Sequence, residues 1–136
     1  LDCSLTGEIP KLMKLTKDFH LSEFDCKDGT PVPDEYFDNV FELAVNLQVL
    51  RDEIDEPVFI SGSGYRTKSH NKKVGGAKNS QHLVAKAADI SVKSKTPKEL
   101  AEVIEKLISE KKMKQGGIGI YPGFVHYDTR GTKARW

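Results

Sequence analysis

The longest regular pattern in this chain is an amphipathic helix that begins near Asp34 and ends before Pro57. Apolar residues recur along it at steps of three and four, which places them on one face. They are Phe37, Val40, Phe41, Ala44, Leu47, Leu50 and Ile54. Asp34 or Pro33 suits the start of a helix, and Pro57 prevents its continuation. Since such a face must be buried against other elements, this helix is expected to organise the fold.

Shorter elements follow the helix. A second helix opens at Thr96, which has a proline after it and Glu99 three residues later, the pattern of a capping box. Four β-rich runs are expected at residues 58–61, 87–92, 117–121 and 124–128. This order predicts an α+β fold, a single small domain in which helices flank an antiparallel sheet.

The N-terminal part is less regular. Residues 1–18 lack periodicity and are interpreted as an arm or linker ahead of a domain at residues 19–136. A short turn is expected at residues 19–24, with Ser22 as its N-cap. Residues 67–80 are expected to form a loop with one helical turn, because glycines and Asn79 interrupt any longer element.

Composition excludes some classes of function. The chain has 21 Lys and Arg against 20 Asp and Glu, a balance that argues against nucleic-acid binding. No run of about 18 apolar residues is present, so no membrane span is predicted. Cys3 and Cys26 permit at most one disulfide, and the sequence leaves open whether they pair.

Three residues have the chemistry of a metal site. His82 is followed seven residues later by Asp89, and His126 comes from a distant segment. Two imidazoles and one carboxylate leave the fourth position of a tetrahedral zinc ion open, which is typical of catalytic rather than structural sites. Zinc lowers the pKa of a bound water toward about 7. We therefore predict zinc at His82, Asp89 and His126.

The surrounding motifs resemble the zinc D-Ala-D-Ala carboxypeptidase family. That family includes the vancomycin-resistance dipeptidases and phage endolysins, and it shares its fold with the hedgehog signalling domain. The resemblance covers roughly residues 19–136. It rests on the stretches at residues 60–67, 74–77, 116–119 and 124–128, and on the family pattern Ser-x-His-x-x-Gly-x-Ala-x-Asp at residues 80–89. One position departs from this pattern, since Ala85 stands where the family usually has glycine.

The resemblance implies roles for further residues. Arg66 would stabilise negative charge on the carbonyl oxygen, and Tyr65 and Ser80 would bind substrate, although Ser80 is also a plausible helix cap. The family's catalytic acid lies three residues before the last histidine, where this chain has Gly123. Asp128 is then the first candidate for the general base, because it shares a strand face with His126.

Asp128 has other possible roles: to orient His126, to hold a substrate amine, or to pair with Arg130. Tyr121 and Tyr127 are weaker candidates for the base. The expected function is a zinc peptidase that hydrolyses peptidoglycan stem peptides, as a carboxypeptidase or an endopeptidase. The alternative is a non-catalytic module that keeps zinc and binds cell-wall peptide or protein.

A monomer is expected to act in the bacterial envelope or periplasm, or outside the cell. It would otherwise be a phage lysin or virion component.

Overall fold

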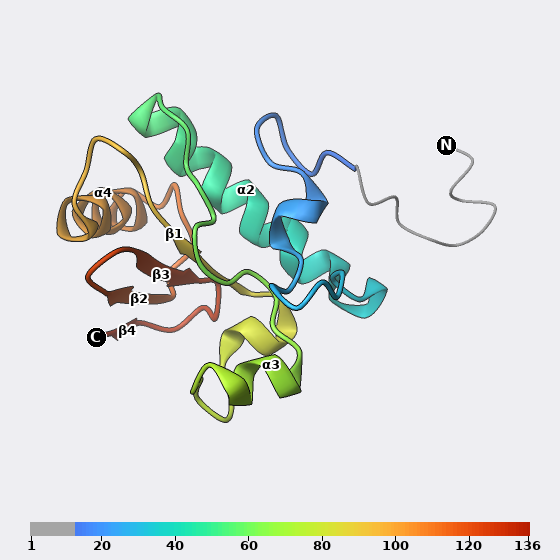
Figure 1. Ribbon diagram of the computed structural model, residues 1–136. Helices are drawn as coiled ribbons and strands as arrows, with labels where there is room; N and C mark the ends of the chain where they lie inside the picture. Colours follow the sequence, from blue (N-terminus) through green and yellow to red (C-terminus); the bar gives the residue numbers. More distant parts are fainter. Residues whose placement is uncertain (1–12) are drawn as a thin grey trace.

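The computed structural model describes residues 13–136 (Figure 1). Its elements, in chain order, are η1 (Leu21–Phe24), η2 (Asp34–Tyr36), α2 (Phe37–Ile54), α3 (Lys68–Lys73), η3 (Gln81–Val84), β1 (Ala87–Ile90), α4 (Pro97–Ser109), β2 (Gly117–Ile120), β3 (Val125–Asp128) and β4 (Ala134–Arg135). The predicted α+β class is confirmed by this combination of helices and one sheet.

Helix α2 is the predicted amphipathic helix, and its apolar face forms the centre of the core. Val40, Leu43, Ala44, Leu47 and Leu50 are fully buried. Phe41 is an exception, since its side chain is exposed. The helix ends at Asp55, which adopts a left-handed conformation (φ 59°) two residues before Pro57.

Helix α4 covers β2 and β3 and also contacts α2. Its predicted capping box is present: the Thr96 hydroxyl accepts from the Glu99 backbone N–H, and the Glu99 carboxylate accepts from the Thr96 N–H. Leu100, Ile104 and Leu107 are buried on its inner face. Local sequence thus determines both where this helix begins and which side faces the core.

The sheet has strand order β1-β3-β2-β4. β3 pairs antiparallel with β1 and β2, as expected, but β4 pairs parallel with β2, so the sheet is mixed. After β3 the chain reverses and crosses to the far side of β2, which makes β4 run in the direction of β2. The expectation of a purely antiparallel sheet was therefore wrong at this edge.

Two local expectations also differ from the structure. Residues 58–61 form a single bridge, Phe59 with Ser91, rather than a strand. The N-cap of η1 is His20 and not Ser22, and the His20 backbone N–H donates to the Glu23 carboxylate. The Phe59–Ser91 bridge and the His20–Glu23 hydrogen bond decide these conformations. The preferences of the individual residues do not reveal such contacts.

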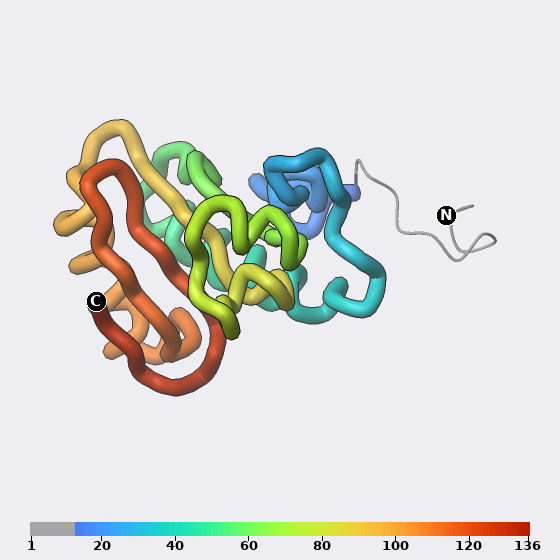
Figure 2. Tube along the Cα trace, turned by 60° about the horizontal axis from the view of Figure 1, so that its bottom comes forward, coloured from blue at the N-terminus to red at the C-terminus, as the bar shows by residue number. Residues whose placement is uncertain are grey.

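Residues 1–12, including Cys3 and most of the expected arm, lie outside the described residues. Within residues 13–18, Leu15 is buried, and Thr16 and Asp18 are hydrogen-bonded to Gln48 of α2. No helix in residues 13–136 is long and apolar enough to cross a membrane. Figure 2 shows the segment around residues 60–85 (green to yellow) between the N-terminal part of the chain and the C-terminal strands.

Candidate metal centre

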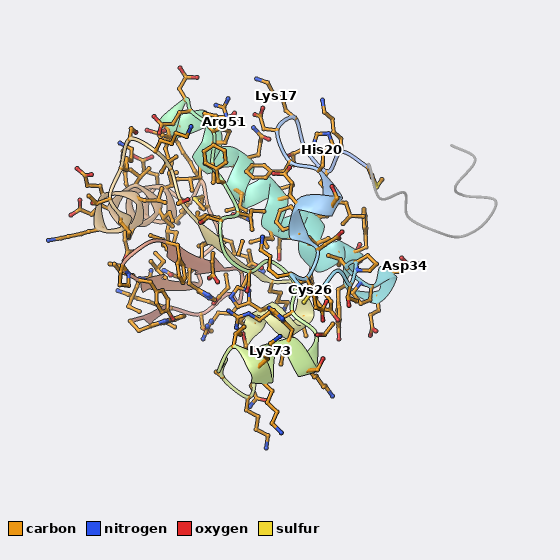
Figure 3. The ribbon with its side chains drawn as sticks, in the orientation of Figure 1. Lys17, His20, Cys26, Asp34, Arg51 and Lys73 are labelled. Carbon is orange, nitrogen blue, oxygen red and sulfur yellow. The ribbon has the colours of Figure 1, made fainter. Side chains whose placement is uncertain are left out.

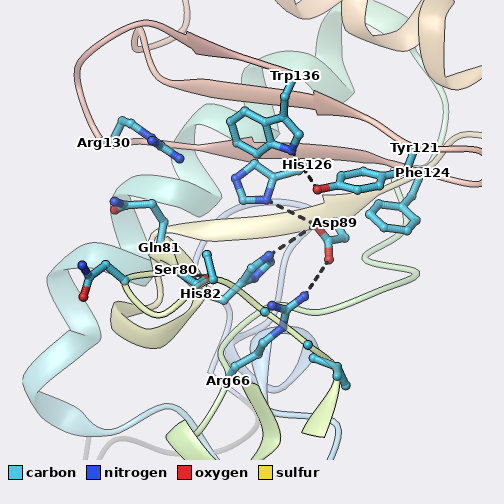
Figure 4. Close-up of a pocket in the computed structure, with 15 residues that line it drawn as sticks. Arg66, Ser80, Gln81, His82, Asp89, Tyr121, Phe124, His126, Arg130 and Trp136 are labelled. Carbon is cyan, nitrogen blue, oxygen red and sulfur yellow. Dashed lines mark hydrogen bonds and ion pairs between the residues drawn. The ribbon is translucent and has the colours of Figure 1, made fainter. Parts of the chain in front are cut away.

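The three predicted ligands come together in the folded chain. His82 comes from η3, Asp89 from β1 and His126 from β3, which pairs with β1 so that Asp89 and His126 are direct partners. One ligand atom from each lies within 4.8 Å of the others, and all three residues are buried. They line a pocket of about 470 Å³ (Figure 4).

The turn that follows His82 explains the departure at Ala85. This residue ends η3 in a left-handed conformation (φ 60°), which favours glycine. The left-handed turn brings the chain from η3 into β1, and therefore from His82 to Asp89. An alanine at this position tolerates the conformation at a cost of about 1–2 kcal/mol.

In each imidazole, the ring nitrogen that points away from Asp89 makes a hydrogen bond that orients the ring. His82 Nδ1 lies 2.7 Å from the Gly64 carbonyl oxygen, and His126 Nε2 lies 2.6 Å from Asp128 Oδ2. Both partners can only accept, so these two nitrogens carry the protons. The lone pairs are consequently on His82 Nε2 and His126 Nδ1, the two nitrogens that face Asp89.

The distances fit a tetrahedral ion. Asp89 Oδ1 lies 3.3 Å from His82 Nε2 and 3.4 Å from His126 Nδ1. Metal–ligand bonds near 2.0–2.1 Å at tetrahedral angles require ligand atoms about 3.4 Å apart. The two imidazoles and the Asp89 carboxylate each direct a lone pair to this point, because the imidazole protons lie on the two outer nitrogens. These lone pairs would repel one another without a cation between them. The donor set therefore fits zinc, and its role as the ligand set stays a prediction.

Asp89 divides its two oxygens between separate tasks. Oδ1 faces the imidazoles, whereas Oδ2 accepts from the Ser63 backbone N–H and lies 3.6 Å from the guanidinium of Arg66. Burial by itself would raise the pKa of Asp89, but the close contacts of its carboxylate with the His126 and His82 rings outweigh burial and lower that pKa well below its usual range. The carboxylate is therefore ionised at neutral pH.

Arg66 lines the pocket. Its Nε donates to Ser63 Oγ (2.9 Å) and its NH1 to Asn71 Oδ1 (3.0 Å). The absence of a side chain at Gly76 permits this contact, because a Cβ there would collide with the Asn71 amide. Arg66 is thus held at a fixed distance from Asp89, with N–H donors left for a substrate oxygen.

Asp128 lies behind His126 rather than in the pocket. Its carboxylate is fully buried and accepts from His126, from the Gly117 N–H and from the Arg130 backbone and guanidinium. Burial alone would raise the pKa of Asp128, but the hydrogen bonds from His126 and Arg130 lower it. A carboxylate with all its acceptor sites committed orients His126 and has no access to a substrate. The geometry therefore disfavours the general-base role.

The remaining predicted residues are distributed differently. Ser80 lines the pocket, but its hydroxyl caps η3 by accepting from the His82 N–H. Tyr65 is nearly buried and lies against Tyr36, beside a neighbouring cavity. Tyr127 is buried, and its hydroxyl donates to the Lys114 carbonyl, which removes it from consideration as a base. Tyr121 lines the pocket, and the position of Gly123 is open.

An aromatic wall, formed by Tyr121, Phe124 and Trp136, was not anticipated. Tyr121 stacks on Phe124 with ring centroids 4.6 Å apart, and its hydroxyl accepts from Trp136 Nε1 at 2.7 Å (Figure 4). Trp136 also contacts the His126 ring. Gly119 makes this possible, since a side chain there would collide with the indole. No local pattern indicates this contact, because it depends on the parallel pairing of β4.

Comparison with known proteins agrees with this geometry. The profile of the family described as peptidase M15 matches residues 14–128, which include all three predicted ligands. No curated protein matches the chain significantly. The family resemblance inferred from the motifs is confirmed by the profile match. This chain belongs to the peptidase M15 family, the zinc D-Ala-D-Ala carboxypeptidases.

Proposed function

We propose that the protein is a zinc-dependent peptidase that hydrolyses stem peptides of peptidoglycan. The observation that carries the zinc assignment is the convergence of ligand atoms from His82, Asp89 and His126, with both imidazole nitrogens 3.3–3.4 Å from Asp89 Oδ1. A zinc ion there would supply a Lewis acid and lower the pKa of a water molecule. The peptidoglycan substrate rests on family membership alone.

The side chains around this point have separate tasks. Arg66 presents a guanidinium whose position is fixed by Ser63 and Asn71, so it stabilises the negative charge that develops on the scissile carbonyl oxygen. The Tyr121 hydroxyl oxygen accepts from the Trp136 indole N–H. The proton of the Tyr121 hydroxyl therefore points away from the indole. We assign to Tyr121 a hydrogen bond with the substrate at the aromatic wall.

Asp128 keeps the proton of His126 on Nε2 and thereby leaves Nδ1 free as a ligand. This role replaces the general-base role first considered for Asp128. Among the described residues that line the pocket, Asp89 is the one carboxylate. We infer that Asp89 Oδ2, which accepts from the Ser63 N–H and lies near the Arg66 guanidinium, is the carboxylate oxygen that can take a proton at the substrate.

The lack of a second pocket carboxylate among residues 13–136 also favours the alternative, a non-catalytic module that binds cell-wall peptide or protein. The two functions differ in turnover. Purified muropeptides incubated with zinc-loaded protein, and analysed by mass spectrometry, should be cleaved, and the products identify a carboxypeptidase or an endopeptidase. Chelated protein and His82→Ala are the controls. Peptide binding without cleavage, at full zinc content, would establish the alternative.

We place its action at the bacterial cell wall, as an envelope or extracellular enzyme or as a phage lysin. The monomeric state expected from the sequence is part of this proposal. Sedimentation of the purified protein tests that state directly.

A further inference from the structure

A second group of potential ligands lies outside the pocket. Cys26, Asp28 and His70 each offer one atom, and the thiol sulfur, the carboxylate oxygen and the ring nitrogen lie within 4.8 Å of one another. None of the three lines the pocket of the His82 centre. The group joins the turn that follows η1 to helix α3, two segments that lie far apart in the sequence.

The turn at residues 26–30 fixes two of these side chains. The Cys26 N–H donates to the Thr30 carbonyl and the Gly29 N–H to the Cys26 carbonyl, with Gly29 at a positive φ of 97°. Asp28 Oδ1 accepts from the Thr30 N–H, and Asp28 Oδ2 accepts from the hydroxyl of Thr67, the N-cap of α3. Cys26 Sγ lies 4.0 Å from the same hydroxyl. Both side chains are thus directed at α3.

His70 approaches from the first turn of α3. Its backbone N–H donates to the Thr67 hydroxyl, which orients this turn toward Asp28. The imidazole is half-buried and, within residues 13–136, has neither a hydrogen bond nor an ion pair. Figure 3 shows Cys26 beside α3, where Lys73 is labelled. A nitrogen without a partner therefore faces a buried thiol and an anchored carboxylate.

The chemistry of this group selects a class of ion. A sulfur, a nitrogen and a carboxylate oxygen form a borderline-soft set, which suits Zn²⁺ and Co²⁺ and not the hard ions Mg²⁺ and Ca²⁺. We propose that Cys26, Asp28 and His70 form a second metal site for zinc or a similar divalent ion. Asp28 is exposed, so water has access to the fourth position. The thiol proton is released to solvent when the ion binds.

The Asp28 carboxylate is in the charged form that a metal ligand requires. A hydrogen bond from the Thr30 backbone, with further ones from the Thr30 and Thr67 side chains, lowers the pKa of Asp28 well below its usual range. The ligand is therefore ionised at neutral pH before any metal arrives.

An ion at this site would connect the turn to the segment that holds Arg66. His70 is followed by Asn71, whose side chain accepts from Arg66 NH1 and donates to the Ala77 carbonyl. Thr67, which follows Arg66, contacts Asp28 and Cys26. The second site is thus a brace for the Arg66 segment, and it stabilises the fold whether or not the protein is a peptidase.

Cobalt titration tests this site independently of activity. In a Cys3→Ser protein, Cys26 is the one remaining thiol, since the chain has two cysteines. A thiolate bound to Co²⁺ gives a charge-transfer band in the near ultraviolet, to which the sulfur-free His82 centre cannot contribute. We expect this band to appear and to saturate as cobalt is added. It should persist in His82→Ala, so the test of the Cys26 site does not depend on metal binding at the His82 centre.

Variants identify the other ligands. In the Cys3→Ser background, His70→Ala and Asp28→Asn should each weaken the cobalt affinity measured from this band by about 10-fold or more. Lys72→Ala, an exposed position on the same helix, should leave it unchanged. His70 is partly exposed, so its replacement tests the site without the folding cost of altering buried Cys26. Absence of the band at saturating cobalt, or a band unaffected by both ligand variants, would overturn the proposal.

Discussion

Replacement of Asp128 by asparagine tests how the fold prepares His126 to bind metal. Oδ1 accepts three hydrogen bonds, from the Gly117 N–H and from the Arg130 backbone N–H and Nε, whereas Oδ2 accepts from His126 Nε2 and Arg130 NH2. In Asp128→Asn the amide oxygen takes the Oδ1 position, and the NH2 group then meets two donors. The imidazole relieves this conflict by moving its proton to Nδ1. That nitrogen lies 3.4 Å from Asp89 Oδ1 and then has no lone pair for a metal.

The expected loss of zinc affinity follows from the loss of this orienting partner of His126. Such replacements cost about 10- to 100-fold in metal affinity, or about 1.4–2.8 kcal/mol at 1.4 kcal/mol per decade. Folding stability of the metal-free protein should also fall by about 1–3 kcal/mol, because hydrogen bonds to a charged group are lost from a fully buried position.

Zinc affinity is measured by competition with a chromophoric chelator, and turnover is expressed per bound zinc. Arg130→Ala is the matched control. It removes the guanidinium contacts but leaves the His126–Asp128 hydrogen bond, so zinc affinity should fall much less. Normal zinc affinity in Asp128→Asn together with abolished turnover would refute this reasoning and restore Asp128 as the general base.

Three further predictions concern the pocket and the core. Arg66→Ala should retain zinc but lower peptide hydrolysis by about 100-fold or more in steady-state assays, since an oxyanion donor is lost; loss of zinc instead would indicate a structural role. Gly119→Ala should displace the indole of Trp136 and change the fluorescence of the chain's single tryptophan, and an unaltered spectrum would contradict the described contact. Leu47→Ala should lower the free energy of unfolding by about 2–5 kcal/mol in chemical denaturation, because Leu47 is fully buried. A loss below about 1 kcal/mol would show that α2 is not tightly packed there.

The site could be predicted from the sequence only as far as its residue types. The spacing of His82 and Asp89, the placement of His126 on a late strand and the motifs around them nominated three ligands. The β1–β3 register then makes Asp89 and His126 direct partners. The partners that choose each imidazole's free nitrogen were not predictable. One is the Gly64 backbone carbonyl, which carries no residue identity. Asp128 was nominated, but its burial behind His126 depends on the packing of the whole sheet.

Sequence by itself determined the elements whose signals are local. The period of α2 and the Thr96–Glu99 capping box each lie within a few residues of chain. Tertiary structure alone decided the parallel pairing of β4, the contact of Trp136 with His126, and the meeting of Cys26 with His70. Helix period and capping follow from neighbours along the chain, whereas these contacts join distant segments and are selected by burial of the common core.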